Sequence, residues 1–350
     1  MNRPKVWLLS AYHTDSHASW ANWLAAQLED FEWEIIALPG RHFRWRIRGN
    51  PLSWLDALPD RPPDLLIATS MVDLATLRGL RPDLANIPCL YYFHENQFAY
   101  PRSAAQHSSI DPQMVQLYGA LAADRIAFNS SYNQESFLAG VQALTDKLPD
   151  HCPRDLADRL KDKSQIIPVP IEPVQVGEKD ARLVLWNHRW EYDKAPEVFA
   201  AAIEQLQRQG VEFRLALLGA RPREAHPTLR WLHQIVPDTQ IVANSYLPKA
   251  DYHRILGRAG IVVSTAIHEF QGVSMLEAVS AGASPLVPDS LCYPQQYPAV
   301  HRYPPGDFEA LAKRLRTWLE DSPPCPPTVA AFWSDNLRTE WKAQLQSLLD

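Results

Sequence analysis

A short apolar run, a glycine-bearing loop, a helical pattern and a second apolar run follow one another between residues 260 and 287. The runs at 260–265 and 284–287 are rich in Val, Ile and Leu, as buried strands of parallel sheets are. Two parallel strands need a crossover, and the helical pattern that begins near Ser274 supplies it. This order predicts a parallel βαβ unit and therefore an α/β fold.

The same alternation of strand and helix patterns runs through most of the chain. Strands are expected at 6–10, 34–38, 64–69, 89–93, 125–128 and 165–169, and again at 182–186, 213–218, 239–243, 261–264 and 284–287. A Pro-rich and then polar segment, 168–180, separates the two sets as a linker. We expect two doubly wound parallel-sheet domains, 1–172 and 173–350, that face a central cleft. The last helix either stays with the second domain or returns to the first.

The composition indicates a globular protein and excludes several classes. A chain of 350 residues that is 46% hydrophobic can form two domains with substantial cores. Its apolar runs are far shorter than the ~20 residues of a membrane span, and the N-terminal run is too short for a signal peptide. The four cysteines lack metal-binding spacing, so reduced thiols in a cytosolic protein are expected.

Two glutamates flank the start of the helix near Ser274. Glu269 ends the preceding loop, and Glu277 lies on the first helical turns. The N–H groups from Gly272 to Ser274 open the helix, where free donors and the helix dipole favour a phosphate. Carboxylates beside that point can accept hydrogen bonds from sugar hydroxyls. Such spacing alone more often marks a solvated helix face, but here the βαβ unit favours a nucleotide-sugar site, made of Glu269, Phe270, Gln271, Gly272, Val273, Ser274 and Glu277.

Two cations follow the first strand of the second domain. Arg189 and Lys194 come after the strand at 182–186, at the same sheet edge as the carboxylates. Alone they are ordinary surface charges. Together with the glutamate loop, they favour a site that neutralises a diphosphate and stabilises it as a leaving group. On topology alone, Gly219 and the loop with Tyr246 and Leu247 are where a base is expected.

The segment 40–49 holds four arginines, a histidine and two aromatic residues. The net charge of −6 gives no general support for nucleic-acid binding. Locally, however, arginines can grip phosphates and aromatic rings can stack on unpaired bases. A solvated Arg-rich loop explains the segment equally well. We expect a loop, because the segment shows no helical periodicity, and this disfavours the amphipathic helix that a lipid acceptor would require.

Polar side chains also follow strands of the first domain. His94, Glu95, Asn96 and Gln97 come directly after the strand at 89–93. A lone histidine is more often structural, but four polar groups at the carboxyl end of a strand favour a site. The first strand-to-helix loop, 10–17, either binds a substrate or uses Asp15 and Ser16 to cap the helix, and the two roles are compatible.

At these residues the chain resembles a known family. Arg189, Lys194 and the Glu269/Glu277 pair are similar in type, order and spacing to those of the retaining GT-B glycosyltransferases of family four. Within that family the chain resembles the tRNA-queuosine mannosyltransferase group. The resemblance spans about residues 8–285 and rests on Ser16-His17 before Trp20, Leu38-Pro39, the run ending Arg48-Gly49, 92–97 with Tyr100-Pro101, 128–130 and 187–191. The strings around His94 and Arg189 are specific, whereas the carboxylate pair is typical of the whole superfamily.

The resemblance implies a GT-B fold, a GDP-mannose donor and retaining transfer to the cyclopentene diol of queuosine in a tRNA anticodon of the tRNA-Asp type. It implies no metal or other cofactor, no membrane and a cytoplasmic location. It also implies that Glu269 holds the transferred sugar, Glu277 the donor ribose, and that His94 lies near the reacting sugar as a catalytic residue beside Arg189 and Lys194. The implied acceptor residues are Ser16, His17, Arg41, Arg44, Trp45, Arg46, Arg48, His94, Glu95, Asn96 and Gln97.

Two alternatives stay open. One is a related GT-B glycosyltransferase with another nucleotide-sugar and a glycan, lipid or small-molecule acceptor. The other is a non-enzymatic tRNA-binding protein, which the intact cations and glutamates disfavour. The first loop departs from the family, which usually carries Gly-Gly before Ser-His, because Thr14-Asp15 stands there instead. Glycines at that point would allow a close backbone approach to the donor.

Overall fold

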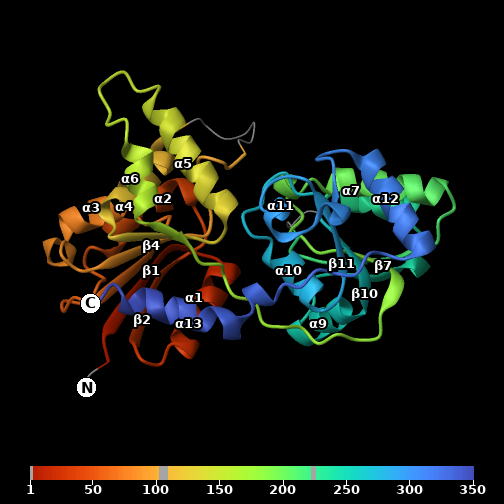
Figure 1. Cartoon of the computed structure of the whole chain (residues 1–350), viewed down its shortest axis with the longest axis horizontal. Coiled ribbons are helices and arrows are strands. Elements are labelled where there is room, and N and C mark those ends of the chain that lie inside the picture. Colours follow the sequence, from red (N-terminus) through yellow and green to blue (C-terminus); the bar gives the residue numbers. More distant parts are fainter. Residues whose placement is uncertain (1–2, 102–108, 222–225) are drawn as a thin grey trace. The chain divides into compact units, whose positions relative to one another are not determined.

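The computed structural model describes residues 3–101, 109–221 and 226–350. The chain forms two compact units (Figure 1): Met1–Pro170 with Asp335–Asp350, and Ile171–Ser334. Each unit is built on a six-stranded sheet in which all neighbouring strands are parallel. The predicted α/β class with two doubly wound parallel sheets is confirmed. The first unit ends at Pro170 rather than at residue 172, and it includes the end of the chain.

The first sheet has the strand order β2-β1-β3-β4-β5-β6. Its strands are β1 (Lys5–His13), β2 (Glu32–Pro39), β3 (Leu65–Thr69), β4 (Cys89–Phe93), β5 (Arg125–Phe128) and β6 (Ser164–Ile166). The two middle strands β3 and β4 are buried along their whole length because helices cover both faces. The order reverses between β1 and β3, which is the switch point at which ligands of such sheets bind.

Seven helices belong to the described part of the first unit. They are α1 (Asp15–Gln27), α2 (Phe43–Trp54), α3 (Leu74–Leu80), α4 (Asp111–Ala122), α5 (Ser131–Thr145), α6 (Leu156–Asp162) and α13 (Ser334–Gln346). Alternate side chains of β1 point to opposite faces of the sheet. Val6 and Leu8 pack with α1 and α13, whereas Trp7 and Leu9 pack with α2 to α6 (Figure 1).

The last helix completes one of these two cores. Trp341 of α13 is fully buried, with its ring centroid 5.6 Å from that of Trp20 and 5.1 Å from that of Tyr92. Its indole nitrogen donates to the Pro168 carbonyl over 3.3 Å. A helix from the far end of the chain therefore closes the face of the first sheet that α1 covers only in part.

The second sheet has the strand order β12-β11-β10-β7-β8-β9. Its strands are β7 (Asp180–Trp186), β8 (Arg214–Leu217), β9 (Ile241–Asn244), β10 (Ala259–Val263), β11 (Ser284–Pro288) and β12 (Arg302–Tyr303). Its helices are α7 (Pro196–Arg208), α8 (Pro227–Ile235), α9 (Lys249–Arg258), α10 (Val273–Ser280), α11 (Tyr293–Gln296) and α12 (Phe308–Asp321). The helices α7, α8 and α12 share one apolar core with the sheet. The strands β7 and β10 are neighbours, so the segments after them meet at one edge.

The Arg-rich segment 40–49 contradicts its prediction as a loop, because most of it belongs to helix α2. The buried positions that anchor this helix, Ile47, Pro51 and Trp54, lie mostly beyond the arginines, so no apolar period is visible within the segment itself. Proline normally breaks a helix because it cannot donate to the carbonyl four residues earlier. Here the Asn50 amide donates instead, to the carbonyl of Arg46 over 2.7 Å and to that of Ile47 over 3.4 Å.

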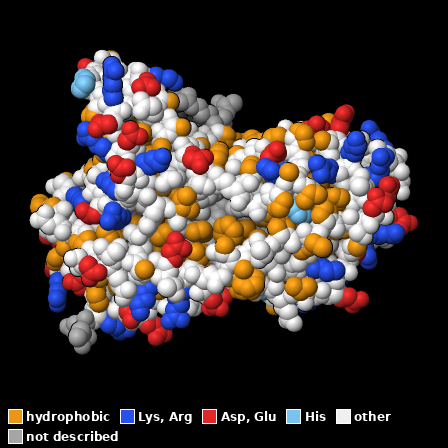
Figure 2. All heavy atoms as spheres, viewed as in Figure 1, with side chains coloured by type: hydrophobic (Ala, Val, Ile, Leu, Met, Phe, Trp, Pro, Cys, Tyr) orange, Lys and Arg blue, Asp and Glu red, His pale blue; other side chains and the backbone are white. Residues whose placement is uncertain are grey.

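Charges of both signs are interspersed over the face of the molecule shown in Figure 2. This agrees with a net charge of only −6 for 350 residues, and it leaves no broad field of one sign on that face. Among the described residues, no helix combines the length and the apolar character that a membrane crossing requires.

Candidate functional site

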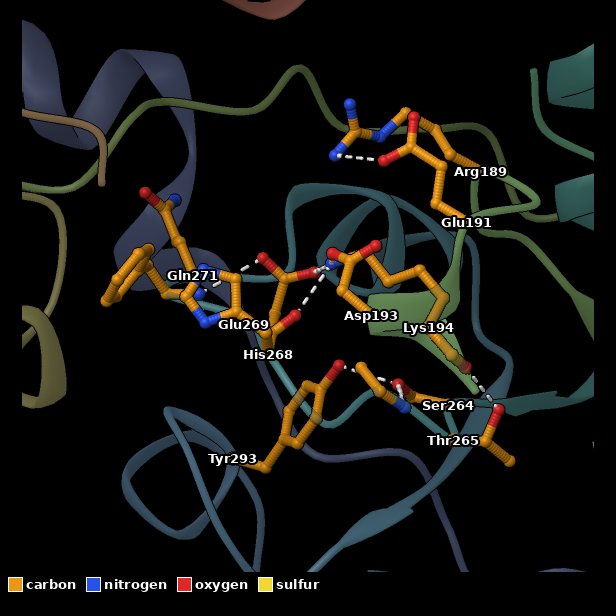
Figure 3. A network of polar contacts seen from close by, with 12 residues as sticks. Arg189, Glu191, Asp193, Lys194, Ser264, Thr265, His268, Glu269, Gln271 and Tyr293 are labelled. Carbon is orange, nitrogen blue, oxygen red and sulfur yellow. Dashed lines mark hydrogen bonds and ion pairs between the residues drawn. The ribbon is translucent and has the colours of Figure 1, made fainter. Parts of the chain in front are cut away.

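The loop between β10 and α10 is fixed by buried hydroxyl groups at the carboxyl end of β10 (Figure 3). The hydroxyls of Ser264 and Tyr293 are 2.7 Å apart. The Thr265 hydroxyl donates to the Lys194 carbonyl over 2.8 Å, which ties this loop to the turn after β7. Because these groups are buried and bonded to one another, the loop presents its remaining side chains in a defined direction.

A buried ammonium group joins the two segments. The Nζ atom of Lys194 donates to the His268 carbonyl over 2.7 Å. The same atom lies 3.2 Å from a carboxylate oxygen of Glu269 and 3.2 Å from one of Asp193. Figure 3 shows both carboxylates turned toward this one nitrogen. Lys194 and Glu269, both predicted at this edge of the sheet, are therefore in direct contact.

Both members of this pair are charged at neutral pH. Burial is the largest influence on the pKa of Lys194 and would lower it, but the carboxylates of Glu269 and Asp193 raise that pKa overall. For the acid Glu269, burial acts in the opposite direction and would raise the pKa. The ammonium of Lys194, the neighbouring His188 and a backbone hydrogen bond from Gly272 outweigh it and hold the pKa of Glu269 at about 2.

Two buried histidines lie beside the pair, and neither is protonated at neutral pH. Burial, followed by the nearby charge of Lys194, lowers the pKa of both His188 and His268 to about 4. The His268 ring meets the Phe270 ring edge-on at 4.6 Å. The Nε2 atom of His188 is buried without a hydrogen-bond partner among the described residues. Lys194 is therefore the cation of this buried group.

Arg189 lies apart from Lys194 and Glu269 (Figure 3). Its side chain is exposed and pairs with Glu191 over 3.4 Å. Exposed ion pairs of this kind are worth little, so a phosphate can replace Glu191 at small cost. Arg189 occupies the predicted turn after β7, but it does not contact the carboxylate of Glu269 as Lys194 does.

The helix α10 begins close to the predicted point, but the Gly272 N–H, predicted to be free, bonds to the Glu269 carboxylate. Gly272 is the residue before the helix and has φ +68°, in the left-handed region that glycine adopts without strain. The residues Val273 and Ser274 then open the helix with N–H groups that have no carbonyl partner within it. Gln271 is buried, and its carbonyl accepts from the Gln296 amide over 2.7 Å.

Glu277 is held by a hydrogen-bond chain that the sequence did not reveal. The Tyr252 hydroxyl donates to a carboxylate oxygen of Glu277 over 2.7 Å. The Asn187 amide donates to that hydroxyl over 2.9 Å and to the Ser274 carbonyl over 3.0 Å. Burial raises the pKa of Glu277 despite the bond from Tyr252. The only signal in the sequence was the place of Asn187 in the motif around Arg189, and none pointed to Tyr252.

The residues predicted to hold a base have different environments. Gly219 has φ +92°, and a Cβ added there would lie 1.9 Å from the His188 carbonyl oxygen. Gly219 thus permits two backbone segments to touch. Tyr246 is 71% exposed, whereas Leu247 is half-buried. The exposed Tyr246 ring is free of packing that would prevent it from stacking on a base.

In the first unit, His94 lies in an aromatic cluster. Its ring centroid is 4.3 Å from that of His17, 4.6 Å from that of Trp20 and 4.7 Å from that of Tyr92. Burial, with the neighbouring His17 and His13, places the pKa of His94 well below its ordinary value. The Nε2 atom of His94 is buried without a hydrogen-bond partner among the described residues. His94 and His17, predicted together from scattered motifs, are therefore in contact.

The first loop is shorter than expected, and the predicted capping role of Asp15 or Ser16 is wrong. Because β1 continues to His13, only Thr14 separates it from α1, and Thr14 is the N-cap residue. Ser16 and His17 therefore lie on the first turn of the helix. The Thr14 hydroxyl is 3.3 Å from that of Ser16 and 3.0 Å from Nδ1 of His17.

The segment after β4 is held mainly by its own polar groups. Asn96 is fully buried, and its amide donates to the side chain of Asn133 over 2.8 Å and accepts from N–H groups two and three residues later. The Gln116 side chain accepts from the N–H of Gln97 and donates to the carbonyl of Glu95. Asn96 therefore shapes the segment, whereas Glu95 and Gln97 are only half-buried.

Five residues of the predicted acceptor set lie on or just before α2: Arg41, Arg44, Trp45, Arg46 and Arg48. Arg41 and Arg44 are exposed, and Arg46 is half-buried. Arg48 pairs over 2.6 Å with Asp73, the N-cap residue of α3. The helix therefore keeps a cationic N-terminal end with an exposed indole, that of Trp45.

Within residues 3–101, 109–221 and 226–350, no three His, Cys, Asp or Glu side chains are grouped so that they could hold a metal ion. The four cysteines are free thiols, and Cys89 and Cys292 are buried. Burial raises the pKa of Cys89 to about 12, so this thiol is not reactive at neutral pH.

Comparisons with known proteins identify the family of this chain. Residues 5–171 match the family model of the tRNA-queuosine alpha-mannosyltransferase N-terminal domain, and residues 170–332 match that of the glycosyl transferases group 1. A tRNA-queuosine alpha-mannosyltransferase of Drosophila melanogaster is 31% identical over 329 residues, which cover 89% of this chain and 86% of the relative. The chain belongs to the tRNA-queuosine alpha-mannosyltransferase family. Like the other members of the family, it is a glycosyltransferase.

Solved structures show that this family member has the GT-B fold. Sucrose-phosphate synthase of Thermosynechococcus elongatus is similar with a TM-score of 0.69 and 15% identity, over 99% of this chain and 95% of that one. The lipopolysaccharide outer core galactosyltransferase WaaB is similar with a TM-score of 0.68 and 12% identity, over 98% of this chain and 99% of that one. At such low identity the likeness concerns the fold alone.

Substitution of Gly219 by alanine should destabilise the second unit more than the same change at Gly210. Both glycines have positive φ, but a Cβ at Gly210 meets nothing within 4 Å, whereas one at Gly219 would collide with the His188 carbonyl. Gly210→Ala should cost about 1–2 kcal/mol of backbone strain, and Gly219→Ala should cost that and the displacement of the turn. Urea denaturation measures both, and equal losses would show that the close contact is unimportant.

The Lys194–Glu269 pair should make the stability of the second unit depend on acid pH. The pKa of Glu269 is about 2 in the folded chain against an ordinary 4.5. The stabilisation is therefore fully present above 4.5 and is lost as the pH falls toward about 2. Over that interval the free energy of unfolding should fall more steeply in the wild type than in Glu269→Gln, as measured by urea denaturation. Parallel curves would contradict this linkage.

Proposed function

We propose that this family member transfers mannose from GDP-mannose to the cyclopentene diol of queuosine in a tRNA anticodon of the tRNA-Asp type, with retention of configuration. Membership of the family supports the reaction class, and the Drosophila melanogaster relative is named as a tRNA-queuosine alpha-mannosyltransferase. The observation that carries the proposal at the level of side chains is the charged pair of Lys194 and Glu269 beside the N-terminus of α10. The queuosine-bearing tRNA would place the protein in the cytoplasm.

The second unit is the proposed donor side. The diphosphate binds to Arg189, Lys194 and the N–H groups that open α10, since cations and a helix N-terminus both favour an anion. Glu269 accepts a hydrogen bond from a hydroxyl of the transferred sugar. Its low pKa keeps it ionised, as that role requires. Glu277 accepts a hydrogen bond from a hydroxyl of the donor ribose. The loop that contains Tyr246 binds the base of the nucleotide.

The proposed reaction takes place on one face of the sugar. The bond from the anomeric carbon to the β-phosphate oxygen breaks, and a bond to the acceptor hydroxyl oxygen forms on the same face. The departing phosphate takes the proton of that hydroxyl, so the products are GDP and the mannosylated nucleoside. Arg189 and Lys194 stabilise the negative charge that develops on the leaving group. In this proposal no metal or other cofactor takes part.

The first unit is the proposed acceptor side. His94 and His17 form its aromatic polar cluster, and the half-buried Glu95 and Gln97 follow β4 beside it. Asn96 supports this segment from within, as its buried hydrogen bonds indicate. The arginines of α2 supply positive charge for the tRNA backbone.

Removal of either proposed diphosphate cation should lower turnover sharply. Arg189→Ala and Lys194→Ala should each reduce kcat by about 100-fold or more, the usual effect of losing one group that stabilises transition-state charge. Arg214→Ala is a matched control, because Arg214 is a half-exposed cation of the same sheet that pairs with Asp180 at the start of β7. If both variants keep near-normal turnover and melt like the wild type, the leaving-group role is wrong.

The reaction itself is tested with purified protein, GDP-mannose and total tRNA from cells grown with and without queuosine. Mass spectrometry of the nucleosides should show one hexose added to queuosine only when donor and modified tRNA are both present. Nucleotide binding without any transfer would favour the alternative of another donor or a glycan, lipid or small-molecule acceptor. Absence of nucleotide binding by calorimetry would remove the basis of the donor site.

A further inference from the structure

The indole of Trp45 rests on a glycine of its own helix. A Cβ added at Gly49, one helical turn later, would lie 2.5, 2.7 and 2.7 Å from three atoms of the Trp45 ring. Three ring atoms at nearly equal distances mean that a face of the indole, rather than its edge, covers the glycine. Any side chain at position 49 would displace the ring, so this arrangement depends on Gly49.

More than half of the Trp45 side chain is exposed to solvent. Trp45 is 54% exposed, which is unusual for the largest apolar side chain, and Gly49 beneath it is buried. Glycine in a helix interior lowers helix stability relative to alanine. The helix therefore carries a destabilising residue whose structural effect is to seat an aromatic ring that stays more than half exposed.

The N-terminal end of α2 carries an excess of positive charge. The stretch 40–54 contains four arginines and no acidic residue in a chain of net charge −6. Cations at a helix N-terminus oppose the helix dipole. The N-cap residue, His42, is left-handed at φ 56° and its side chain makes no capping hydrogen bond. Of the arginines, Arg48 pairs with Asp73, while Arg41 and Arg44 are exposed.

We propose that Trp45, seated on Gly49, is a stacking platform for an unpaired nucleobase of the acceptor RNA, and that the N-terminal end of α2 binds the phosphate next to that base. The proposal rests on the proposed function and deepens its acceptor side. A flat aromatic face beside exposed arginines matches the way in which proteins hold single-stranded RNA, by base stacking and backbone neutralisation. A paired duplex offers the same phosphates but no free base.

The test compares two fluorescent RNAs by anisotropy in the absence of donor: a hairpin with an anticodon-type loop, and a fully paired duplex of equal length. Trp45→Ala should weaken hairpin binding about 10-fold, within the range for loss of one stacked base, and should leave duplex binding unchanged. Trp45→Phe should lose less, because it keeps an aromatic face. Arg44→Ala should weaken binding of both RNAs.

Gly49→Ala separates the platform from a folding defect. Alanine is the better helix former, so thermal stability should be kept or raised while hairpin binding falls, because the ring is pushed out of place. Leu52→Ala is the matched control, since Leu52 is a 61% exposed apolar residue of the same helix and should not affect RNA binding.

Three results would overturn the platform. They are unchanged hairpin binding by Trp45→Ala, equal losses for hairpin and duplex, and Trp45-dependent binding to phosphatidylserine vesicles without any effect on the hairpin. Hexose transfer to queuosine is measured separately. Trp45-dependent hairpin binding without hexose transfer would support the platform and reject the mannosyltransferase reaction. Hexose transfer by Trp45→Ala at an unchanged KM for tRNA would support the reaction and reject the platform.

Discussion

The buried ammonium of Lys194 is the interaction on which the second unit depends. It bonds to the His268 carbonyl and lies between the carboxylates of Glu269 and Asp193, so it fixes the turn after β7 against the loop after β10. These segments meet because β7 and β10 are parallel neighbours in the sheet. A buried pair of this kind is costly to break, since the remaining partner would keep an uncompensated charge. The fold of the loop and the charge of the site are therefore one feature.

Burial determines which groups around this ammonium are charged. The two neighbouring histidines, His188 and His268, lose their protons because burial and Lys194 both disfavour a second positive charge. The carboxylate of Glu277, in contrast, forms no ion pair with another described residue and is held by the hydroxyl of Tyr252. The two glutamates that look equivalent in the sequence thus differ in character. Glu269 is firmly ionised, and the pKa of Glu277 is shifted in the opposite direction.

Sequence patterns predicted the features of the fold that depend on local apolar runs and on the order of the strands. The strand β4 was predicted with its exact bounds, and Lys194 and Glu269 were predicted at one sheet edge, where the structure brings them into contact. The helix α2 was missed because its anchoring residues lie beyond the arginines and because Pro51 argues against a helix unless Asn50 replaces the lost donor. The roles of Tyr252 and Gly219 depend on contacts between distant segments, which no local pattern encodes.

The place of α13 has a consequence for how the protein is made. Its Trp341 completes the aromatic core formed with Trp20 and Tyr92, yet the ribosome synthesises this helix only after the entire second unit. Until then the face of the first sheet beside α1 leaves large aromatic side chains uncovered. The core of the first unit is therefore complete only once α13 has been synthesised, whereas the second unit is built from one continuous stretch of chain that precedes α13.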